Sequence, residues 1–239
     1  SGMSEGKDIH EDLKPGYSDY AHAGVKAGLS LFPIIGGPIS EFFSMIIAPP
    51  LSKRREEWMG IIYQELVRLE TEIDGFRIDN LKDNEQFISV LLYATNIAMR
   101  THQKEKIEAL RNAVINSATD LPLEDDIQFI FLNLIDRYTP LHLKLLEKMD
   151  EFHSRDVHKL LVHSSGSLIK SDLSILIPEF KNNFELSYKI EKDLVNDGLI
   201  YEDKLPDEAI NPKTNQRRRT TILGQKFLKF IKSPFNPDQ

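Results

Sequence analysis

The chain has 239 residues, and its 30 Lys+Arg against 37 Asp+Glu give a net charge of −7 with His neutral. This acidic balance excludes a bulk nucleic-acid coat, although a local basic patch can still bind nucleic acid. The chain has no cysteine, which excludes disulfides, thiol nucleophiles and sites that hold zinc or iron–sulfur clusters through cysteine.

The first 50 residues change from polar to apolar. Residues 1–19 are polar and predict a terminal arm without a secretory signal, so we expect a cytoplasmic protein. Residues 27–51 carry a single charge, Glu41, and their length suits a membrane span. Prolines at 33, 38, 49 and 50 divide this segment, however, and favour two short apolar helices that form a buried hairpin.

A second interpretation of the apolar segment places it on a membrane. The hairpin would leave the core and insert into lipid, as in pore-forming proteins that are first released into water. Glu41, paired with Arg54 or Arg55, would then be the latch that holds the hairpin in place.

The stretch from residue 52 to residue 150 reads as helical throughout. Ser52 is the predicted N-cap of a helix with an apolar stripe from Trp58 to Ile73, and Asp83 is the predicted cap of the next. Further helices are expected over residues 84–117, with a polar, slightly bent middle at 100–106, over 125–137, and from Pro140 onward with Thr139 as the cap. Residues 20–150 are therefore predicted to form an all-α domain.

The charge changes sign in the last third. Residues 1–154 carry a net −9 and residues 155–239 a net +2, which predicts a domain boundary near 150–155. The second part reads as a helix, a short apolar helix, a longer helix, a strand, a polar loop, a second strand and a closing helix. The helices and strands among them are predicted over residues 157–162, 172–177, 184–196, 199–201, 217–223 and 224–231. Gly198 follows the longer helix, where a left-handed residue is expected. The order predicts a winged-helix domain over residues 151–233 that folds by itself, followed by a tail at 234–239.

Three parts of the sequence carry a resemblance to known families. The run "DLVNDGLI…RRRTTILGQKFLKF" resembles the stretch of bacterial winged-helix proteins in which the third helix leads into the wing and a final helix. The segments "ATNIAMRTHQKEKIEALRNAVINSA" and "FIFLNLIDRYTPLHLKLLEKM" resemble those of an uncharacterised bacterial family. The order of apolar segment, helical middle and terminal winged helix is similar to that of the abortive-infection alpha family. This resemblance implies a bacterial protein of a phage-defence or stress system, and it carries over no functional residue.

The charges of the winged helix decide between DNA and protein as its partner. Residues 184–196, the third helix of the module, carry a net charge of −1, whereas recognition helices are usually basic. The wing offers Lys213, Arg217, Arg218 and Arg219, but side chains alternate between the two faces of a strand. Protein docking is therefore the leading interpretation, and DNA binding through these four residues is an alternative.

One short motif could carry a reaction. Arg137 and His142 match the Arg-x4-His pattern of HEPN ribonucleases, in which the His acts in acid–base chemistry and the Arg holds phosphate. The motif straddles a helix break, and the alternative is an Arg at a helix end beside a hydrogen-bonded, partly buried His. His153, His158 and His163 recur every five residues and spread around a helix, so no metal site is predicted.

The sequence thus predicts a mainly α fold, with an N-terminal helical bundle containing an apolar hairpin and a C-terminal winged-helix α/β domain. The expected function is that of a non-enzymatic bacterial regulatory or interaction protein, with no cofactor and no small-molecule substrate. Its partner would be a second copy or another protein. The alternatives are a membrane-acting defence effector, a DNA-binding transcriptional regulator and a ribonuclease.

Overall fold

The computed structural model describes residues 38–119, 123–151, 173–202, 210–211, 216–217 and 219–235, with backbone only for residues 38–52, 210–211 and 216–217. Within these residues the fold is mainly helical, which confirms the predicted class. The chain divides into two compact units, Ser1–Tyr63 and Gln64–Gln239, and each is described by itself.

Helix α2 covers Pro38–Glu72 and continues through Pro49-Pro50, so the predicted helix end there and the Ser52 cap are wrong. The two prolines remove the donors to the carbonyls of Met45 and Ile46, but their fixed φ is a helical value, so the helix can continue. The N-terminal part of the hairpin and the side chain of Glu41 lie outside the described residues, and the latch stays a prediction. No helix in the described ranges has the length and apolarity needed to cross a bilayer.

The predicted apolar stripe of α2 is largely confirmed. Trp58, Ile62, Leu66 and Leu69 are buried, whereas Ile73 is 41% exposed. Ile73 lies beyond Glu72, the last residue of the helix, and Gly75 follows with a φ of 83°. That left-handed conformation ends the helix and turns the chain away.

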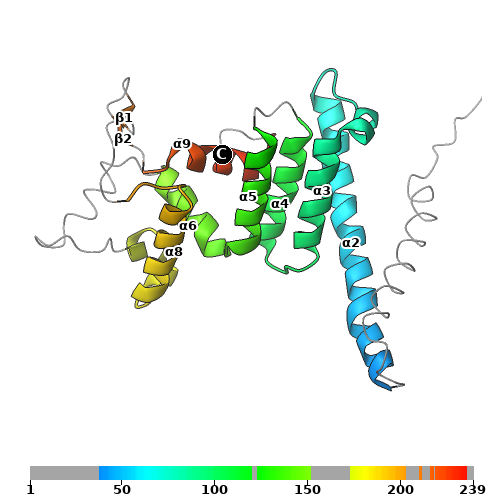
Figure 1. Cartoon of the computed structure of the whole chain (residues 1–239), viewed down its shortest axis with the longest axis horizontal. Helices are drawn as coiled ribbons and strands as arrows, with labels where there is room; N and C mark the ends of the chain where they lie inside the picture. The colour runs from blue at the N-terminus through cyan, green and yellow to red at the C-terminus, as the bar shows by residue number, and fades with distance from the viewer. Residues whose placement is uncertain are drawn as a thin grey trace, which may run out of the picture. The chain divides into compact units, whose positions relative to one another are not determined.

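The predicted long helix over residues 84–117 is two helices, α3 at Glu85–Ala98 and α4 at Lys104–Ser117, preceded by the 3-10 turn η1 at Ile78–Asp83. Because the chain reverses at residues 99–103, the two helices pack against each other and share their apolar faces (Figure 1). A single continuous helix would leave those faces without this mutual contact. The cap of α3 is Asn84, one residue beyond the predicted Asp83, and its side chain accepts from the amide of Phe87 at 3.0 Å.

Helix α5 at Asp125–Arg137 has the predicted bounds, and α6 at Pro140–Glu151 begins at the predicted proline. Helix α5 packs on α3 and α4. The inward faces of α5 and α6 are apolar and fully buried, and the largest side chains there are Phe131, Leu132, Ile135, Leu145 and Leu146. These helices form the apolar core, and helices that follow later in the chain pack against it.

After residue 172 the chain forms two short 3-10 turns and one helix. The turns η2 at Leu173–Ile175 and η3 at Pro178–Phe180 replace the predicted helix 172–177, and Pro178 begins the second turn because proline suits a first helical position. Helix α8 covers Phe184–Asn196 as predicted and packs on α6. Gly198 has a φ of 75°, the expected left-handed value.

Extended segments follow α8. Ile200 pairs antiparallel with Thr220 in a single bridge, and strand β1 at Ile210–Asn211 pairs antiparallel with strand β2 at Gln216–Arg217. Helix α9 covers Ile222–Ile231, so it begins two residues before the predicted start and shortens the predicted strand. The reason is an N-cap, because the Thr221 hydroxyl accepts from the amide of Gly224 at 2.9 Å.

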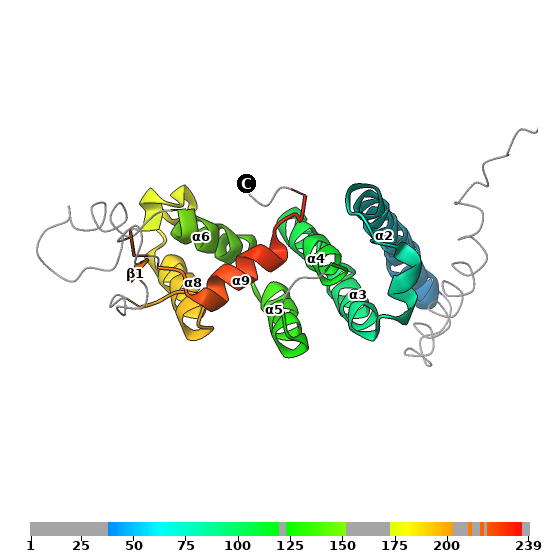
Figure 2. The same cartoon turned by 90° about the horizontal axis from the view of Figure 1, so that it is seen from above.

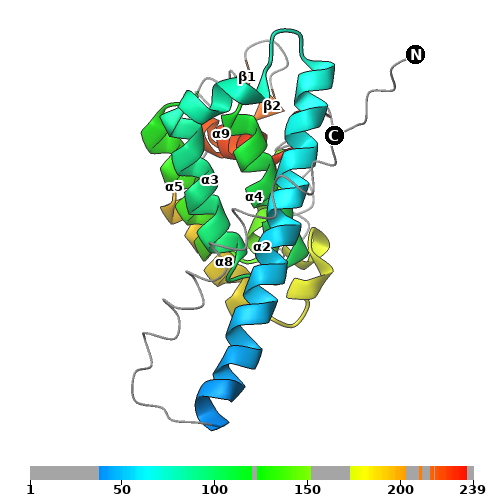
Figure 3. The same ribbon diagram turned by 90° about the vertical axis from the view of Figure 1, so that its right-hand side faces the viewer.

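Helix α9 joins the late elements to the early ones. It packs on α4 as well as on α6, and Figures 1 and 2 show it lying across the direction of α3, α4 and α5, while Figure 3 shows it nearly end-on. Its Phe227 and Phe230 rings lie 5.2 and 5.6 Å from the ring of Phe131 on α5. The boundary predicted near 150–155 stays a prediction, but this packing buries the closing helix against the first half of the chain.

Two asparagines on α4 hold the C-terminal end of α9. The Asn112 amide donates to the carbonyl of Ile231 at 2.8 Å, and the Asn116 amide donates to the carbonyls of Phe230 and Lys232, each at 2.8 Å. The last carbonyls of a helix have no partner within that helix. Both asparagines are buried, so their donors replace the solvent that these carbonyls would otherwise need.

Candidate functional site

Arg137 and His142 lie in a polar network at the corner between α5 and α6. The Arg137 guanidinium donates to one carboxylate oxygen of Asp197 at 2.7 Å, and the Tyr138 hydroxyl donates to the other at 2.6 Å. His142 Nε2 lies 3.0 Å from a carboxylate oxygen of Asp193. The Tyr138 and His142 rings stack with centroids 4.7 Å apart and an interplanar angle of 4°. The motif residues are therefore joined by two carboxylates at the end of α8.

The hydrogen bonds fix the protonation state of His142. Its Nδ1 accepts from the Thr139 amide at 3.1 Å and lies 2.9 Å from the Thr139 hydroxyl, so the ring proton is on Nε2 and is donated to Asp193. Burial lowers the pKa of His142, although the hydrogen bond to Asp193 acts in the opposite direction. The imidazole is therefore neutral near pH 7, and both of its nitrogens are engaged within the chain.

This geometry supports a structural role for the pair. A general base needs a nitrogen within reach of a substrate proton, and here the Nδ1 lone pair faces a backbone amide. The hydrogen bond to Asp197 raises the pKa of Arg137. The guanidinium therefore stays protonated, and its positive charge lies against the Asp197 carboxylate. The pair connects the α5–α6 corner to α8, which matches the hydrogen-bonded alternative given above for the motif.

Asp193 and Asp197 were not singled out from the sequence. They are spaced four residues apart at the C-terminal end of α8, where the helix dipole disfavours negative charge. Two carboxylates at such a position indicate that hydrogen-bond donors or cations of the same chain lie nearby. Burial works against the ionised form of Asp193, but hydrogen bonds from Lys189 and His142 prevail and lower its pKa.

The wing residues are only partly described. Arg219 is 8% exposed, and its guanidinium donates to Glu191 on α8 at 2.5 Å and to the Tyr201 carbonyl at 3.2 Å. Its predicted place on a phosphate-binding surface is therefore wrong, because the countercharge of Glu191 and the Tyr201 carbonyl hold it inside. The side chains of Lys213, Arg217 and Arg218 lie outside the described residues, and their role stays a prediction.

Helix α8 presents a face with exposed aromatic rings. We define the α8 outer face as Phe184, Glu185, Tyr188, Lys189 and Lys192. Phe184 and Tyr188 are 44% and 49% exposed, and their rings stack with centroids 6.1 Å apart. Lys189 pairs with Asp193 at 2.5 Å and Lys192 pairs with Glu202 at 2.6 Å. Its aromatic rings are thus open to solvent, while its two lysines are neutralised by nearby carboxylates.

The opposite side of α8 faces the protein. Ser187, Ile190 and Leu194 are buried. Because this side packs on α6, the exposed side chains of α8 in the described part of the chain are those of its outer face and its two ends.

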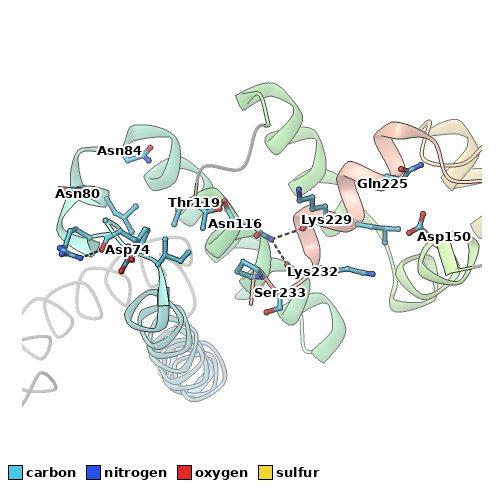
Figure 4. Close-up of a pocket in the computed structure, with 18 residues that line it drawn as sticks. Asp74, Asn80, Asn84, Asn116, Thr119, Asp150, Gln225, Lys229, Lys232 and Ser233 are labelled. Atoms are coloured by element: carbon cyan, nitrogen blue, oxygen red, sulfur yellow. Dashed lines mark hydrogen bonds between the residues drawn. The ribbon is translucent and has the colours of Figure 1, made fainter. Parts of the chain in front are cut away.

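A groove of about 1030 Å³ lies where several helices end (Figure 4). Its walls come from the C-terminal ends of α2, α4 and α9, from η1, and from Asp150 near the end of α6. Polar side chains line much of it, and Figure 4 labels Asn80, Asn84, Thr119, Gln225 and Ser233 among them. Lys229 on α9 and Lys232 directly after it also line the groove, where cations suit the C-terminal ends of helices. No local sequence pattern signals this groove, because its walls come from segments far apart in the chain.

The structure also describes the two arginines predicted to pair with Glu41 and the side chains that could bind a metal ion. Arg54 is half-buried and Arg55 is exposed; neither is shown next to Glu41, whose side chain is not described. Among the side chains that the structure describes, no three of His, Asp or Glu converge in a way that could hold a metal ion.

Comparison of the chain with models of known families, with curated proteins and with solved structures found no match in any of the three. The resemblance to the abortive-infection alpha family therefore stays a prediction.

Proposed function

We propose that the protein is a non-enzymatic bacterial interaction protein that binds a protein partner through the outer face of α8. The observation that carries this proposal is the pair of exposed, stacked rings of Phe184 and Tyr188 beside lysines that are already paired. Aromatic residues are enriched in the centre of protein–protein interfaces. The resemblance given above favours a place in a phage-defence or stress system.

We further propose that α8 is the third helix of a winged-helix module. The packing of α6 on α8, the bridge between Ile200 and Thr220, and the paired strands β1 and β2 support this arrangement. The packing of α6 on α8 supports a module that also includes α6 and begins at Pro140, whereas the sequence predicted a start at residue 151.

The charges favour protein over DNA as the partner. Binding to a phosphate backbone depends on lysines and arginines that neutralise phosphates. Lys189 and Lys192 are paired with Asp193 and Glu202, and Arg219 is buried beside Glu191. A duplex approaching α8 would therefore meet Glu185, Asp193 and Glu202 beside these lysines, and the carboxylates would repel its phosphates.

Site-specific photo-crosslinking tests the proposal. A benzophenone amino acid is placed at Tyr188 in the full chain, expressed in cells of the source species, and in a control chain at Asn96, an exposed position on α3. We expect a discrete protein adduct from position 188 and none from position 96. Absence of an adduct at 188 would overturn the proposal.

A titration with duplex DNA provides the second arm. We expect no binding at low salt. Binding that weakens with salt and is lost when Lys189 and Lys192 are both replaced by Ala would establish the DNA alternative instead.

A further inference from the structure

We infer that the partner of the α8 outer face is a second copy of this chain, bound across a two-fold axis in an antiparallel α8–α8 contact. The inference rests on the proposed function of α8 as a protein-docking helix and names its partner. The observation behind it is that the aromatic and the charged side chains of the outer face are spaced so that the face is complementary to itself in charge.

The outer face contains two parallel rows with the same spacing. Phe184 and Tyr188 form one row, and Glu185 and Lys189 form the other, each four residues apart. At about 100° per residue these four side chains cover an arc of about 140°. All four are exposed, and the opposite side of the helix is buried.

A two-fold axis perpendicular to α8 near residues 186–187 pairs these rows. In a two-fold contact, residue i of one copy meets residue j of the other, and j meets i. Phe184 would then lie against Tyr188 of the partner subunit, and Glu185 would face Lys189 of the partner subunit. Each contact occurs twice, so the dimer gains two aromatic contacts and two ion pairs.

The ion pair between Lys189 and Asp193 within one chain does not prevent Lys189 from pairing with Glu185 of the partner subunit. The Lys189 side chain is 70% exposed in its ion pair with Asp193, and exposed pairs of this kind contribute little. Asp193 keeps its hydrogen bond from His142 when Lys189 turns to a partner. Charge complementarity therefore points to a second copy, because one acid and one base stand at positions that a two-fold axis exchanges.

The absence of cysteine from the chain makes a direct test available. In Glu185→Cys the two sulfurs would lie close to the axis, so mild oxidation should produce a covalent dimer. The matched control is Asn196→Cys, which is exposed on the same side of the same helix. At about 1.5 Å per residue it lies about 14 Å from the axis, too far for a disulfide in this arrangement.

Sedimentation equilibrium provides the second readout. The chain of 27.5 kDa should sediment at twice that mass. The variants Glu185→Lys and Lys189→Glu should each be monomeric, and the double variant that exchanges the two charges should restore the dimer. Circular dichroism of all variants should match the wild type, because the substituted side chains are exposed.

A wild-type chain that sediments as a monomer at high concentration would overturn the inference. Equal disulfide formation in Glu185→Cys and Asn196→Cys would also overturn it. If the chain is monomeric while position 188 still crosslinks to a different protein, the dimer fails and the proposed function stands. If neither is observed, both fail.

Discussion

Acidification is expected to destabilise the fold through His142. Protonation would place a second N–H on Nδ1, which now accepts from the Thr139 amide at 3.1 Å, and would put a charge on a side chain that is 6% exposed. Burial accordingly lowers the pKa of His142 from its ordinary value of 6.5, so the unfolded chain takes up the proton at higher pH than the folded chain. Stability is therefore complete above pH 6.5 and falls as the pH drops through the window between 6.5 and the lowered folded pKa. One proton limits the slope to about 1.4 kcal/mol per pH unit.

The assay is urea denaturation followed by circular dichroism at several pH values from about 7 to about 5, for the wild type and for His142→Gln. Gln can accept from Thr139 and donate to Asp193 without titrating, so subtracting the two curves removes the contribution of every other ionisable group. We expect the wild type to lose stability relative to the variant as the pH falls. The control is His102→Gln at an exposed position, which tests whether the loss of any histidine produces the same difference.

A difference between wild type and His142→Gln that is independent of pH would refute the reasoning. The same variants address the ribonuclease alternative. If the wild type cleaves RNA, and His142→Gln loses this activity with its stability unchanged at neutral pH, His142 acts in the reaction rather than in the fold.

Three further outcomes can be measured by the same denaturation method. Gly224→Ala should destabilise the protein by about 1–3 kcal/mol, because its Cβ would lie 2.1 Å from the carbonyl oxygen of Leu199. The control Gly60→Ala, whose Cβ would have no heavy atom within 4 Å, should be neutral or slightly stabilising. Equal stabilities of the two variants would contradict this reasoning. Asn116→Ala should cost about 1–3 kcal/mol, because buried carbonyls at the end of α9 lose their donor, and an unchanged midpoint would show that water replaces the amide. The isolated fragment 151–239 should lack stable helix, because α9 packs on α4, and a native-like spectrum with a cooperative transition would support the independent domain predicted from the sequence.

The sequence by itself determined the elements whose limits depend on neighbouring residues. Helices α5 and α8 have the bounds that their sequence patterns predicted, and α6 begins at its predicted proline. Gly198 has the left-handed conformation that its place after α8 required. These signals are local, since a capping side chain or a left-handed glycine acts within one turn of helix.

The tertiary structure decided where helices break or continue. Residues 99–103 form a turn because α3 and α4 bury their apolar faces against each other, a gain that the polar residues of this stretch did not reveal. Conversely, α2 continues through Pro49-Pro50 although the local rule predicts an end. At residues 99–103 the local preference is a few kcal/mol at most, and the packing of α3 on α4 over a whole helix face exceeds it.

The tertiary structure also chose the partners of the polar side chains. Arg137 and His142 were recognised from the sequence, but their environment is set by Asp197 and Asp193, which are 60 and 51 residues away. Asn112 bonds a carbonyl 119 residues later, and Arg219 turns inward to Glu191 instead of outward to a phosphate. A residue type determines which bonds a side chain can make. The partner that it meets depends on how distant segments pack, and a local pattern in the chain does not contain that information.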